Sequence, residues 1–191
     1  LPYDKKSDQH YDLISAFIKS IRGSDADAAL YWMVRMLEGG EDPSFIARRL
    51  VILASEDIGN ADPKALPLAV SGFQAVELIG LPEAAINLSQ VVTYLATAPK
   101  SNASYMALHA AKEFVLKHSK SPPPAYLQSS YLAKSLGKEA DYKYPHDYEK
   151  SWVQQKYLPD DINPEKTRFY SPKAIGFEKH IRDFLSWLKA K

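Results

Sequence analysis

Apolar residues recur three and four positions apart along the first 120 residues of this chain. That spacing puts apolar side chains on one face of an α-helix, and it predicts a series of amphipathic helices. We expect six of them, interrupted near residues 23–24, 39–42, 59–62, 80–83 and 98–101. No segment of this part alternates with period two, so no strand is expected in it.

Residues at these breaks predict where several helices begin. Asp25 is expected to cap the second helix, since a short polar side chain can accept the free N–H groups of a first turn. Asp-Pro pairs at 42–43 and 62–63 predict the starts of the third and fourth helices, because proline suits the first helical position. The short loops imply that consecutive helices pack as neighbours.

Two of these helices carry more specific expectations. The third, which runs to about Ala54, is apolar around most of its girth from Leu50 onward. A helix of this kind is expected to lie centrally and to be covered on several sides. The sixth, at about 102–118, carries an apolar stripe of Ala107, Leu108, Ala111, Phe114 and Val115.

The pattern changes at the three prolines 122–124, which predict a stiff extended connector. A short helix is expected at about 130–136. Residues 138–172 are rich in tyrosine, proline and charge, and they predict an irregular arm that wraps over the helical body and could contain a short hairpin. The last segment, about 172–189, has the apolar spacing of an amphipathic helix. The predicted fold class is all-α: a multi-helix bundle with an irregular Tyr/Pro-rich arm and a C-terminal helix.

The composition narrows the possible chemistry. The chain has 191 residues and no cysteine, which excludes disulfides, thiolate metal sites and cysteine nucleophiles. It has 24 Lys and Arg against 23 Asp and Glu, so no overall charge draws it to nucleic acid or to a membrane surface. No apolar run reaches the roughly 20 residues that cross a bilayer, and no signal peptide is recognisable. Because the chain opens without methionine, we expect it to be a piece of a longer protein.

The pair Gly137–Lys138 is the one place where a phosphate-binding loop could be sought. Such a loop needs a Ser or Thr after the lysine and another glycine five residues before the first of the pair. Here Glu139 follows and Leu132 stands at the earlier position. A helix end followed by a solvated lysine is expected instead.

Glu56 and Asp57 could form an acid/base pair. Adjacent residues on a helix point about 100° apart, however, so their side chains converge poorly on one substrate atom. We expect these two carboxylates to pair structurally with Arg48, Arg49 or a neighbouring subunit. The sequence contains neither a Gly-x-Ser-x-Gly nor a His-Glu-x-x-His pattern, which are typical of serine hydrolases and zinc proteases.

Other positions could bind a ligand or a partner. His146 can pair with its neighbour Asp147, and we favour a packing or hydrogen-bonding role for it over a specific site. Lys100, near a predicted helix start, could contact a phosphate, although a plain cap by Ser101 is favoured. Basic and aromatic residues interleave at 165–191. They suit either a groove that follows a nucleic-acid backbone or the solvated face of a helix.

Several short motifs stand in a fixed order along the chain. They are Arg22-Gly-Ser-Asp25, Ala28-Ala-Leu-Tyr-Trp32, Ala47-Arg-Arg-Leu50, Ala54-Ser-Glu-Asp-Ile-Gly59, Ala61-Asp-Pro63, Ala96-Thr-Ala-Pro-Lys-Ser-Asn102 and Tyr144-Pro-His-Asp147. As an ordered set they resemble the C-terminal region of the MgsA/RarA family. Members of that family are AAA+ ATPases linked to replication-fork maintenance and recombination, and their eukaryotic counterpart is the Werner-helicase-interacting protein. The resemblance runs from about residue 3 to about residue 177.

The resemblance implies a fold like the C-terminal collar domain of clamp-loader subunits, which drives assembly, here into an expected tetramer. It implies that residues 1–22 are the junction with the ATPase lid, 23–120 the oligomerisation core, and 121–191 the arm and C-terminal helix packed on the same domain. The family's ATP and Mg²⁺ sites would precede this chain, so no catalytic residue, cofactor or metal is assigned to it. The interface or interaction candidates are Arg22, Asp25, Trp32, Arg48, Arg49, Glu56, Asp57, Lys100, Asn102, His146 and Asp147.

We therefore interpret the chain as the oligomerisation domain of an AAA+ ATPase of DNA replication, recombination and repair, and not as an enzyme in itself. Expected partners are further copies of the chain, its own ATPase module and, through the intact protein, DNA and replication proteins, but no membrane. The expected location is the cytoplasm, in association with the nucleoid. Two alternatives stay open. One is a DNA- or protein-docking module that uses the basic tail and the aromatic arm, and the other is an independent enzyme that uses Glu56, Asp57 or His146.

Overall fold

A computed structural model describes residues 8–118, 120–129, 134–135, 137 and 141–190. All regular elements in these residues are helices, and no strand occurs among them. The prediction of an all-α fold is thereby confirmed. The chain divides into two compact units, one of residues 1–106 and 172–182, the other of residues 107–171 and 183–191.

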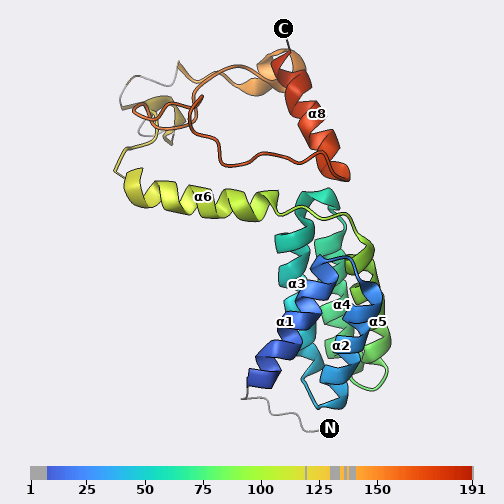
Figure 1. Cartoon of the computed structure of the whole chain (residues 1–191). Helices are drawn as coiled ribbons and strands as arrows, with labels where there is room; N and C mark the ends of the chain where they lie inside the picture. Colours follow the sequence, from blue (N-terminus) through green and yellow to red (C-terminus); the bar gives the residue numbers. More distant parts are fainter. Residues whose placement is uncertain (1–7, 119, 130–133, 136, 138–140, 191) are drawn as a thin grey trace. The chain divides into compact units, whose positions relative to one another are not determined.

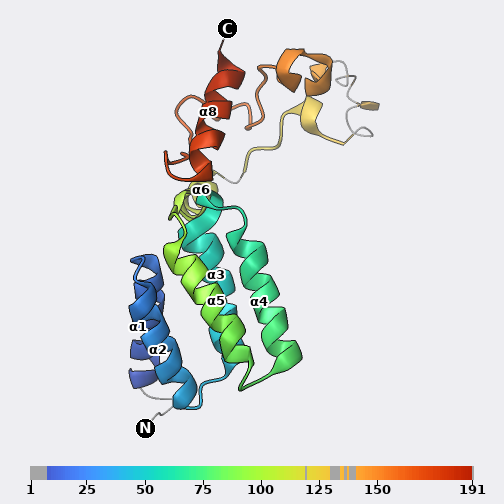
Figure 2. The same ribbon diagram turned by 90° about the vertical axis from the view of Figure 1, so that its right-hand side faces the viewer.

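Five α-helices build the first unit, and each packs against a neighbour along the chain (Figures 1 and 2). They are α1 (Asp8–Arg22), α2 (Ala26–Glu38), α3 (Pro43–Leu53), α4 (Ala65–Ile79) and α5 (Ala84–Thr97). α1 contacts α2, α3 contacts α4, and α4 contacts α5, as the short loops predicted. A π-helix, η1 (Ala54–Ile58), and a 3-10 turn, η2 (Gly59–Ala61), connect α3 to α4.

The predicted caps of α2 and α3 are confirmed. The Asp25 carboxylate accepts the N–H of Ala28 at 2.8 Å, and that of Asp42 accepts the N–H of Ser44 at 2.9 Å. The chain turns towards the fourth helix at Asp62–Pro63, where Asp62 Oδ1 accepts the N–H of Lys64 at 3.0 Å. The regular helix α4 begins two residues later than predicted, at Ala65.

The helix at the centre of the bundle is α5 and not α3. α5 contacts α1, α2, α3 and α4, and Leu88, Val92 and Leu95 are fully buried on it. α3 contacts α4 and α5, and Leu50 on it is buried, as expected of a helix covered on several sides. One face of α3 remains open, however, because Ile52 is 48 % exposed.

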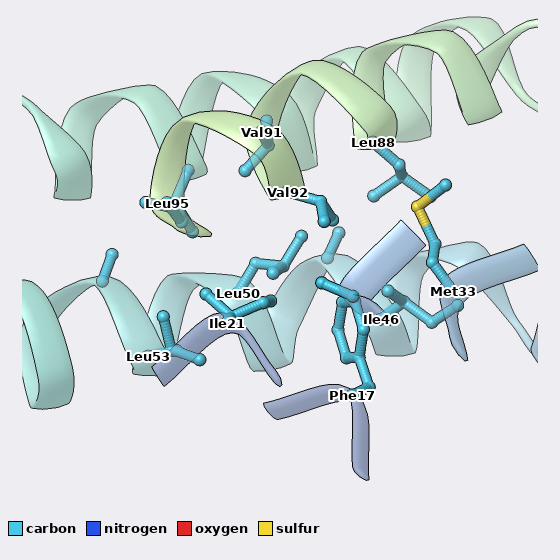
Figure 3. Packing of buried hydrophobic residues seen from close by; sticks show 14 of the residues in the cluster. Phe17, Ile21, Met33, Ile46, Leu50, Leu53, Leu88, Val91, Val92 and Leu95 are labelled. Carbon is cyan, nitrogen blue, oxygen red and sulfur yellow. The ribbon is translucent and has the colours of Figure 1, made fainter. Parts of the chain in front are cut away.

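The core of the first unit contains buried residues from all five of its α-helices. Figure 3 shows Phe17 and Ile21 of α1 among labelled side chains of α2, α3 and α5. Burial of one such large apolar side chain contributes about 1.5–3 kcal/mol. Since both α1 residues are fully buried, α1 is an integral part of this core.

The segment that leads into the last helix, α8 (Phe177–Lys189), belongs to the first unit as far as residue 182. Gly176 has a φ of +56°, a conformation that glycine adopts with little strain. A Cβ at this position would lie far inside the van der Waals radius of the Ala61 carbonyl oxygen. Because Gly176 has no side chain, the backbone of this segment can approach η2 closely. Glu178, two residues further on, is fully buried.

Within its described residues, the second unit contains most of α6 (Ala103–His118), the end of α8 and, between them, three complete 3-10 turns. The turns are η3 (Ala125–Leu127), η5 (Pro145–Asp147) and η6 (Glu149–Ser151). The predicted hairpin of the arm is absent from the described residues 141–172, which contain no strand. The short helix predicted at 130–136 lies mostly outside the described residues.

The apolar stripe predicted for α6 is covered only in part. Leu108 and Val115 are exposed, whereas its other three residues are half-buried. Phe114 of this helix is half-buried, and its ring lies against Phe169 of the arm and stacks on His118. Helical period alone shows which residues share a face, and it does not show that another element covers that face.

None of the helices in the described part of the chain combines the length and the apolar character that spanning a bilayer demands.

Candidate functional site

Three of the sequence motifs meet at one end of the first unit. The last residue of α1 is Arg22, η1 carries Glu56 and Asp57, and the loop after α5 carries Lys100. These residues are far apart in the sequence, yet hydrogen bonds and ion pairs join them into one cluster, which we call the charged cluster.

The charged cluster is built around an ion pair between Arg22 and Asp57. Arg22 Nε donates to Asp57 Oδ1 at 2.7 Å, and Arg22 Nη2 lies 3.9 Å from Glu56 Oε1. The Asp57 side chain is 9 % exposed, whereas that of Arg22 is 45 % exposed. The hydrogen bond to Asp57 raises the pKa of the Arg22 guanidinium above its ordinary high value, so this cation keeps its charge.

Lys100 ties the loop after α5 to the turn after α1. Its Nζ donates to the carbonyl oxygens of Ala98 at 2.6 Å and Ala96 at 2.9 Å, and to the Ser24 hydroxyl at 3.0 Å. Burial lowers the pKa of the Lys100 ammonium, while the nearby charge of Asp57 acts in the opposite direction. Three acceptors already use the three donors of this ammonium, which weakens the interpretation of Lys100 as a phosphate contact.

The two residues after Lys100 also have structural partners. Ser101 is buried, and its hydroxyl accepts the N–H of Ala103 at 3.2 Å. The preferred prediction, a cap by Ser101, is therefore confirmed. Asn102 Oδ1 accepts a hydrogen bond from Lys173 Nζ at 2.8 Å, which fastens the segment before α8 to the start of α6.

The arrangement of the charged cluster favours structural support over acid/base catalysis. One oxygen of Asp57 is paired with a guanidinium, and its buried Oδ2 has no hydrogen bond. Glu56 and Asp57 share the same cation, and no hydroxyl nucleophile stands between them. Within the described residues, no group of three or more His, Asp or Glu side chains could hold a metal ion.

Arg48 and Arg49, the predicted partners of the two carboxylates, lie elsewhere. Arg48 is exposed on α3, with Nη2 3.7 Å from Asp42 Oδ2. Arg49 is half-buried, and its Nε has no hydrogen bond. The expectation that these arginines pair with Glu56 and Asp57 within the chain is wrong, because α1 delivers Arg22 to that position.

Arg48 instead borders an apolar groove between α3 and α4. The groove has a volume of about 350 Å³, and the residues that line it are Arg48, Val51, Ile52, Val70 and Phe73. Four of these five side chains are apolar, and this groove is where α3 remains uncovered.

Trp32 belongs to a cluster of aromatic and charged residues on α2. Its ring meets that of Tyr31 edge-on, with centroids 4.9 Å apart, and the Arg35 guanidinium lies 5.4 Å from the Trp32 centroid. Tyr31 is 56 % exposed, and Val34 next to it is 48 % exposed. Trp32 itself is half-buried against the core, whereas exposed Tyr and Arg side chains such as Tyr31 and Arg35 are enriched at protein interfaces.

His146 and Asp147 lie in η5, in the second unit, and both are exposed. The His146 ring lies against Tyr144, with centroids 5.1 Å apart. No hydrogen bond or ion pair joins these two described residues to each other, so the suggested pairing is absent.

The sequence reasoning missed two polar pairs that join helices of the first unit. Tyr94 on α5 donates its hydroxyl to Asp62 Oδ2 at 2.6 Å. His10 on α1 is buried with its Nδ1 2.8 Å from Glu41 Oε2, in the turn before α3. Both pairs connect residues about 30 positions apart, and no local pattern in the sequence signals such a contact.

Comparison with known proteins identifies the source of these motifs. A family model described as "MgsA AAA+ ATPase C terminal" matches residues 23–189, and one described as "AAA C-terminal domain" matches residues 1–22. An uncharacterised AAA domain-containing protein of Mycobacterium tuberculosis is 50 % identical over 190 residues, which are 98 % of this chain and 42 % of that protein.

Relatives from other organisms match over similar lengths. Replication-associated recombination protein A of Bacillus subtilis is 43 % identical over 183 residues, 94 % of this chain and 43 % of that protein. A Dictyostelium discoideum protein named ATPase WRNIP1 is 47 % identical over 169 residues, 87 % of this chain and 19 % of that protein. The chain thus spans less than half the length of these relatives.

Proposed function

Because this chain belongs to the family of MgsA AAA+ ATPase C-terminal domains, we propose that it is the assembly domain of an ATPase that acts in replication-associated recombination and repair. The names of the relatives supply that process. The ATPase module would lie in the part of the relatives that this chain does not span, and it would bind ATP and Mg²⁺. In this proposal the chain itself performs no chemistry.

The observation that carries the proposal is that apolar side chains of the first unit are exposed on two of its faces. Tyr31 and Val34 are exposed on α2, and Ile52 and Val70 are exposed at the α3–α4 groove. Groups of exposed apolar side chains on a folded domain indicate contact with another protein surface. Two such faces on different helices suit a subunit that contacts more than one neighbour.

The charged cluster suits a mechanical role in such an assembly. It fastens the end of α1 to η1 and to the loop after α5 through Arg22, Asp57 and Lys100. Since α1 also contributes to the core, a force applied to α1 would be transmitted to the whole bundle. We propose that the ATPase module is attached through α1, so that its movements act on a rigid support.

The assembled state proposed is a homo-oligomer, with four subunits as the expected number. The test is the solution mass of this chain by light scattering over a series of concentrations. A multimer that persists on dilution would support assembly through this domain, and four subunits would support the tetramer. A monomer at every concentration up to about 1 mM, the range of weak association, would overturn the proposal.

The proposed partners of the intact protein are DNA and other replication proteins, and its proposed location is the cytoplasm, with the nucleoid. This chain would reach DNA mainly through its attachment to the ATPase module, because its net charge is +1.

A second candidate function, docking of nucleic acid or protein, is favoured by one feature of the second unit. Phe184 and Trp187 on α8 are exposed and stacked, with centroids 5.8 Å apart, and Lys150 Nζ lies 5.0 Å from the Trp187 ring. Aromatic rings beside a cation can stack with bases of single-stranded nucleic acid.

The test of this second candidate is the affinity of the chain for a fluorescent single-stranded oligonucleotide at two salt concentrations. One stacked base is worth about 1–3 kcal/mol, so Trp187→Ala should weaken binding by at least fivefold. Trp187→Phe, which keeps an aromatic ring, is the matched control. If the wild type and both Trp187 variants bind the oligonucleotide with equal affinity, the Trp187 ring does not contribute to nucleic-acid binding.

A further inference from the structure

We propose that the exposed face of α2 is a two-fold interface with a second copy of this chain, in which two α2 helices pack antiparallel with Tyr31 at the symmetry axis. The inference rests on the proposed function, because it names the surface through which one pair of subunits would assemble. The α2 face is defined by Asp27, Leu30, Tyr31, Val34 and Arg35.

The α2 face contains a straight row of residues spaced by four. Asp27, Tyr31 and Arg35 follow one another along the helix, and four residues rise about 6 Å. Asp27 and Arg35 therefore stand about 6 Å on either side of Tyr31. A shallow hollow of about 500 Å³ lies along this row, and the residues lining it are Asp27, Leu30, Tyr31, Val34, Arg35 and Glu38.

The charges of this row are complementary to themselves under a two-fold rotation. With Tyr31 on the axis, Asp27 of one copy comes opposite Arg35 of the other, and the same pair repeats on the far side. Within the described residues neither side chain has an ion-pair partner, and both are exposed. A parallel arrangement in register would bring like charges together, so the charge pattern selects the antiparallel one.

The apolar positions are complementary under the same rotation. Positions equidistant from Tyr31 on this face lie at the same level across the axis, which pairs Val34 with Ala28. A large side chain thus faces a small one at this pair, as close helix packing requires. Arg35 already lies over Tyr31 and Trp32, 5.9 Å and 5.4 Å from their centroids, so less conformational entropy is lost when it binds a partner carboxylate.

The α3–α4 groove lacks this pattern. Arg48 is its one charged lining residue, so the groove carries no pair of opposite charges that a two-fold rotation could match. For this reason the α2 face is the one assigned to a second copy.

The first experiment exchanges the charges of the row and measures the solution mass over a concentration series. Asp27→Arg and Arg35→Asp should each weaken association at least tenfold, since each variant creates two like-charge contacts. The double variant Asp27→Arg/Arg35→Asp should restore association to within about threefold of the wild type. Asp12→Arg, the same change at an exposed site on α1, is the matched control and should have no effect.

A change in the stability of α2 cannot explain the recovery of association in the double variant. Both substitutions oppose the α2 dipole, because a cation replaces an anion in the first turn and an anion replaces a cation in the last. The double variant therefore has the least stable α2, although it should assemble best of the three. Circular dichroism at each concentration checks that the helix is formed.

The second experiment uses the absence of cysteine from the chain. Helices packed about 8–10 Å apart leave facing Cα atoms at the axis roughly 4–5 Å apart, which a disulfide can bridge. Tyr31→Cys should give a disulfide-linked dimer under mild oxidation. Leu78→Cys on α4, at a residue that is 86 % exposed, controls for random collision.

The outcomes separate this inference from the proposed function. A multimeric wild type with charge rescue, and cross-linking at position 31 above that at position 78, supports both. If the wild type is multimeric but the double variant stays dissociated, the α2 interface is overturned and assembly through this chain still stands. The same conclusion follows if Tyr31→Cys and Leu78→Cys form disulfide-linked dimers equally well. A wild type that is monomeric throughout overturns both.

Discussion

Arg22 and Asp57 are 35 positions apart in the chain, and their side chains are 2.7 Å apart in the fold. Asp57→Asn should lower the free energy of unfolding by about 1–2 kcal/mol. This value is smaller than the roughly 3–5 kcal/mol of a fully buried pair, because Arg22 is partly screened by solvent. Urea denaturation measures the loss, and Glu56→Gln, at the longer contact, is the control with an expected change below about 0.5 kcal/mol. If both variants lose the same free energy of unfolding, the Arg22–Asp57 pair contributes no more than the longer Arg22–Glu56 contact.

Tyr94 makes stability depend on pH through its hydroxyl. The hydrogen bond to Asp62, together with burial and the charge of Asp62, raises the pKa of the Tyr94 phenol in the folded chain. A phenol whose folded pKa is raised stabilises the fold fully below the ordinary tyrosine value of about 10, and this stabilisation is lost as pH rises through the raised value.

Tyr94→Phe should therefore cost about 1 kcal/mol at pH 8, and the cost should shrink above about pH 10, where the unfolded wild type ionises. Urea denaturation of both proteins from pH 8 to 11 measures the difference, in which all other tyrosines cancel. Tyr144→Phe, at an exposed tyrosine, should show no such trend. A cost that stays constant to pH 11 would contradict the role of the Asp62 hydrogen bond.

At the scale of elements, the segment before α8 depends on one close backbone approach. Gly176→Ala places a Cβ against the Ala61 carbonyl oxygen and also strains a positive φ, so residues 172–182 should lose their packing on the first unit. Hydrogen exchange should show faster exchange at the start of α8, while the amides of α2 and α5 stay protected.

Gly137→Ala is the matched control for this change. Gly137 also has a positive φ, of 63°, but nothing lies within 4 Å of a Cβ placed there. Its substitution should cost only the backbone strain, about 1 kcal/mol, and it should leave α8 unchanged. If the amides at the start of α8 exchange at the same rate in both variants, backbone strain and not the contact with Ala61 causes the faster exchange.

At the scale of the whole molecule, buried apolar residues are unevenly divided between the two units. Among the described residues, Ile162 and Pro124 are the buried apolar residues that belong to the second unit, whereas the first unit has more than twenty. Since apolar burial is the main stabilising contribution, the second unit should unfold at a lower urea concentration than the first, by about 1 M if the stabilities differ by about 2 kcal/mol.

The three tryptophans allow this prediction to be measured in the full chain. Trp32 lies in the first unit, and Trp152 and Trp187 lie in the second. Trp32→Phe leaves fluorescence that reports the second unit, and Trp152→Phe/Trp187→Phe leaves a reporter of the first. Coincident transitions in the two variants would show that the units unfold as one.

Much of the fold was open to prediction because it depends on local patterns. The helices follow from apolar period and short breaks, and the caps at Asp25 and Asp42 follow from side chains that satisfy the N–H groups next to them. The ordered motifs predicted the family, which the comparisons confirm. The Asp62 carboxylate accepts the nearby N–H of Lys64, which the local pattern signals, and also the Tyr94 hydroxyl 32 residues away, which it does not.

The amino-acid sequence was enough to predict the helices and most of their ends, because these depend on neighbours within a few residues, and its ordered motifs predicted the family. The packing of distant helices was needed to show that Asp57 pairs with Arg22 and not with Arg48 or Arg49, and that Ile52 and Leu108 are exposed. Helical period states which residues share a face. What covers that face depends on how distant helices pack, and no local pattern contains that information.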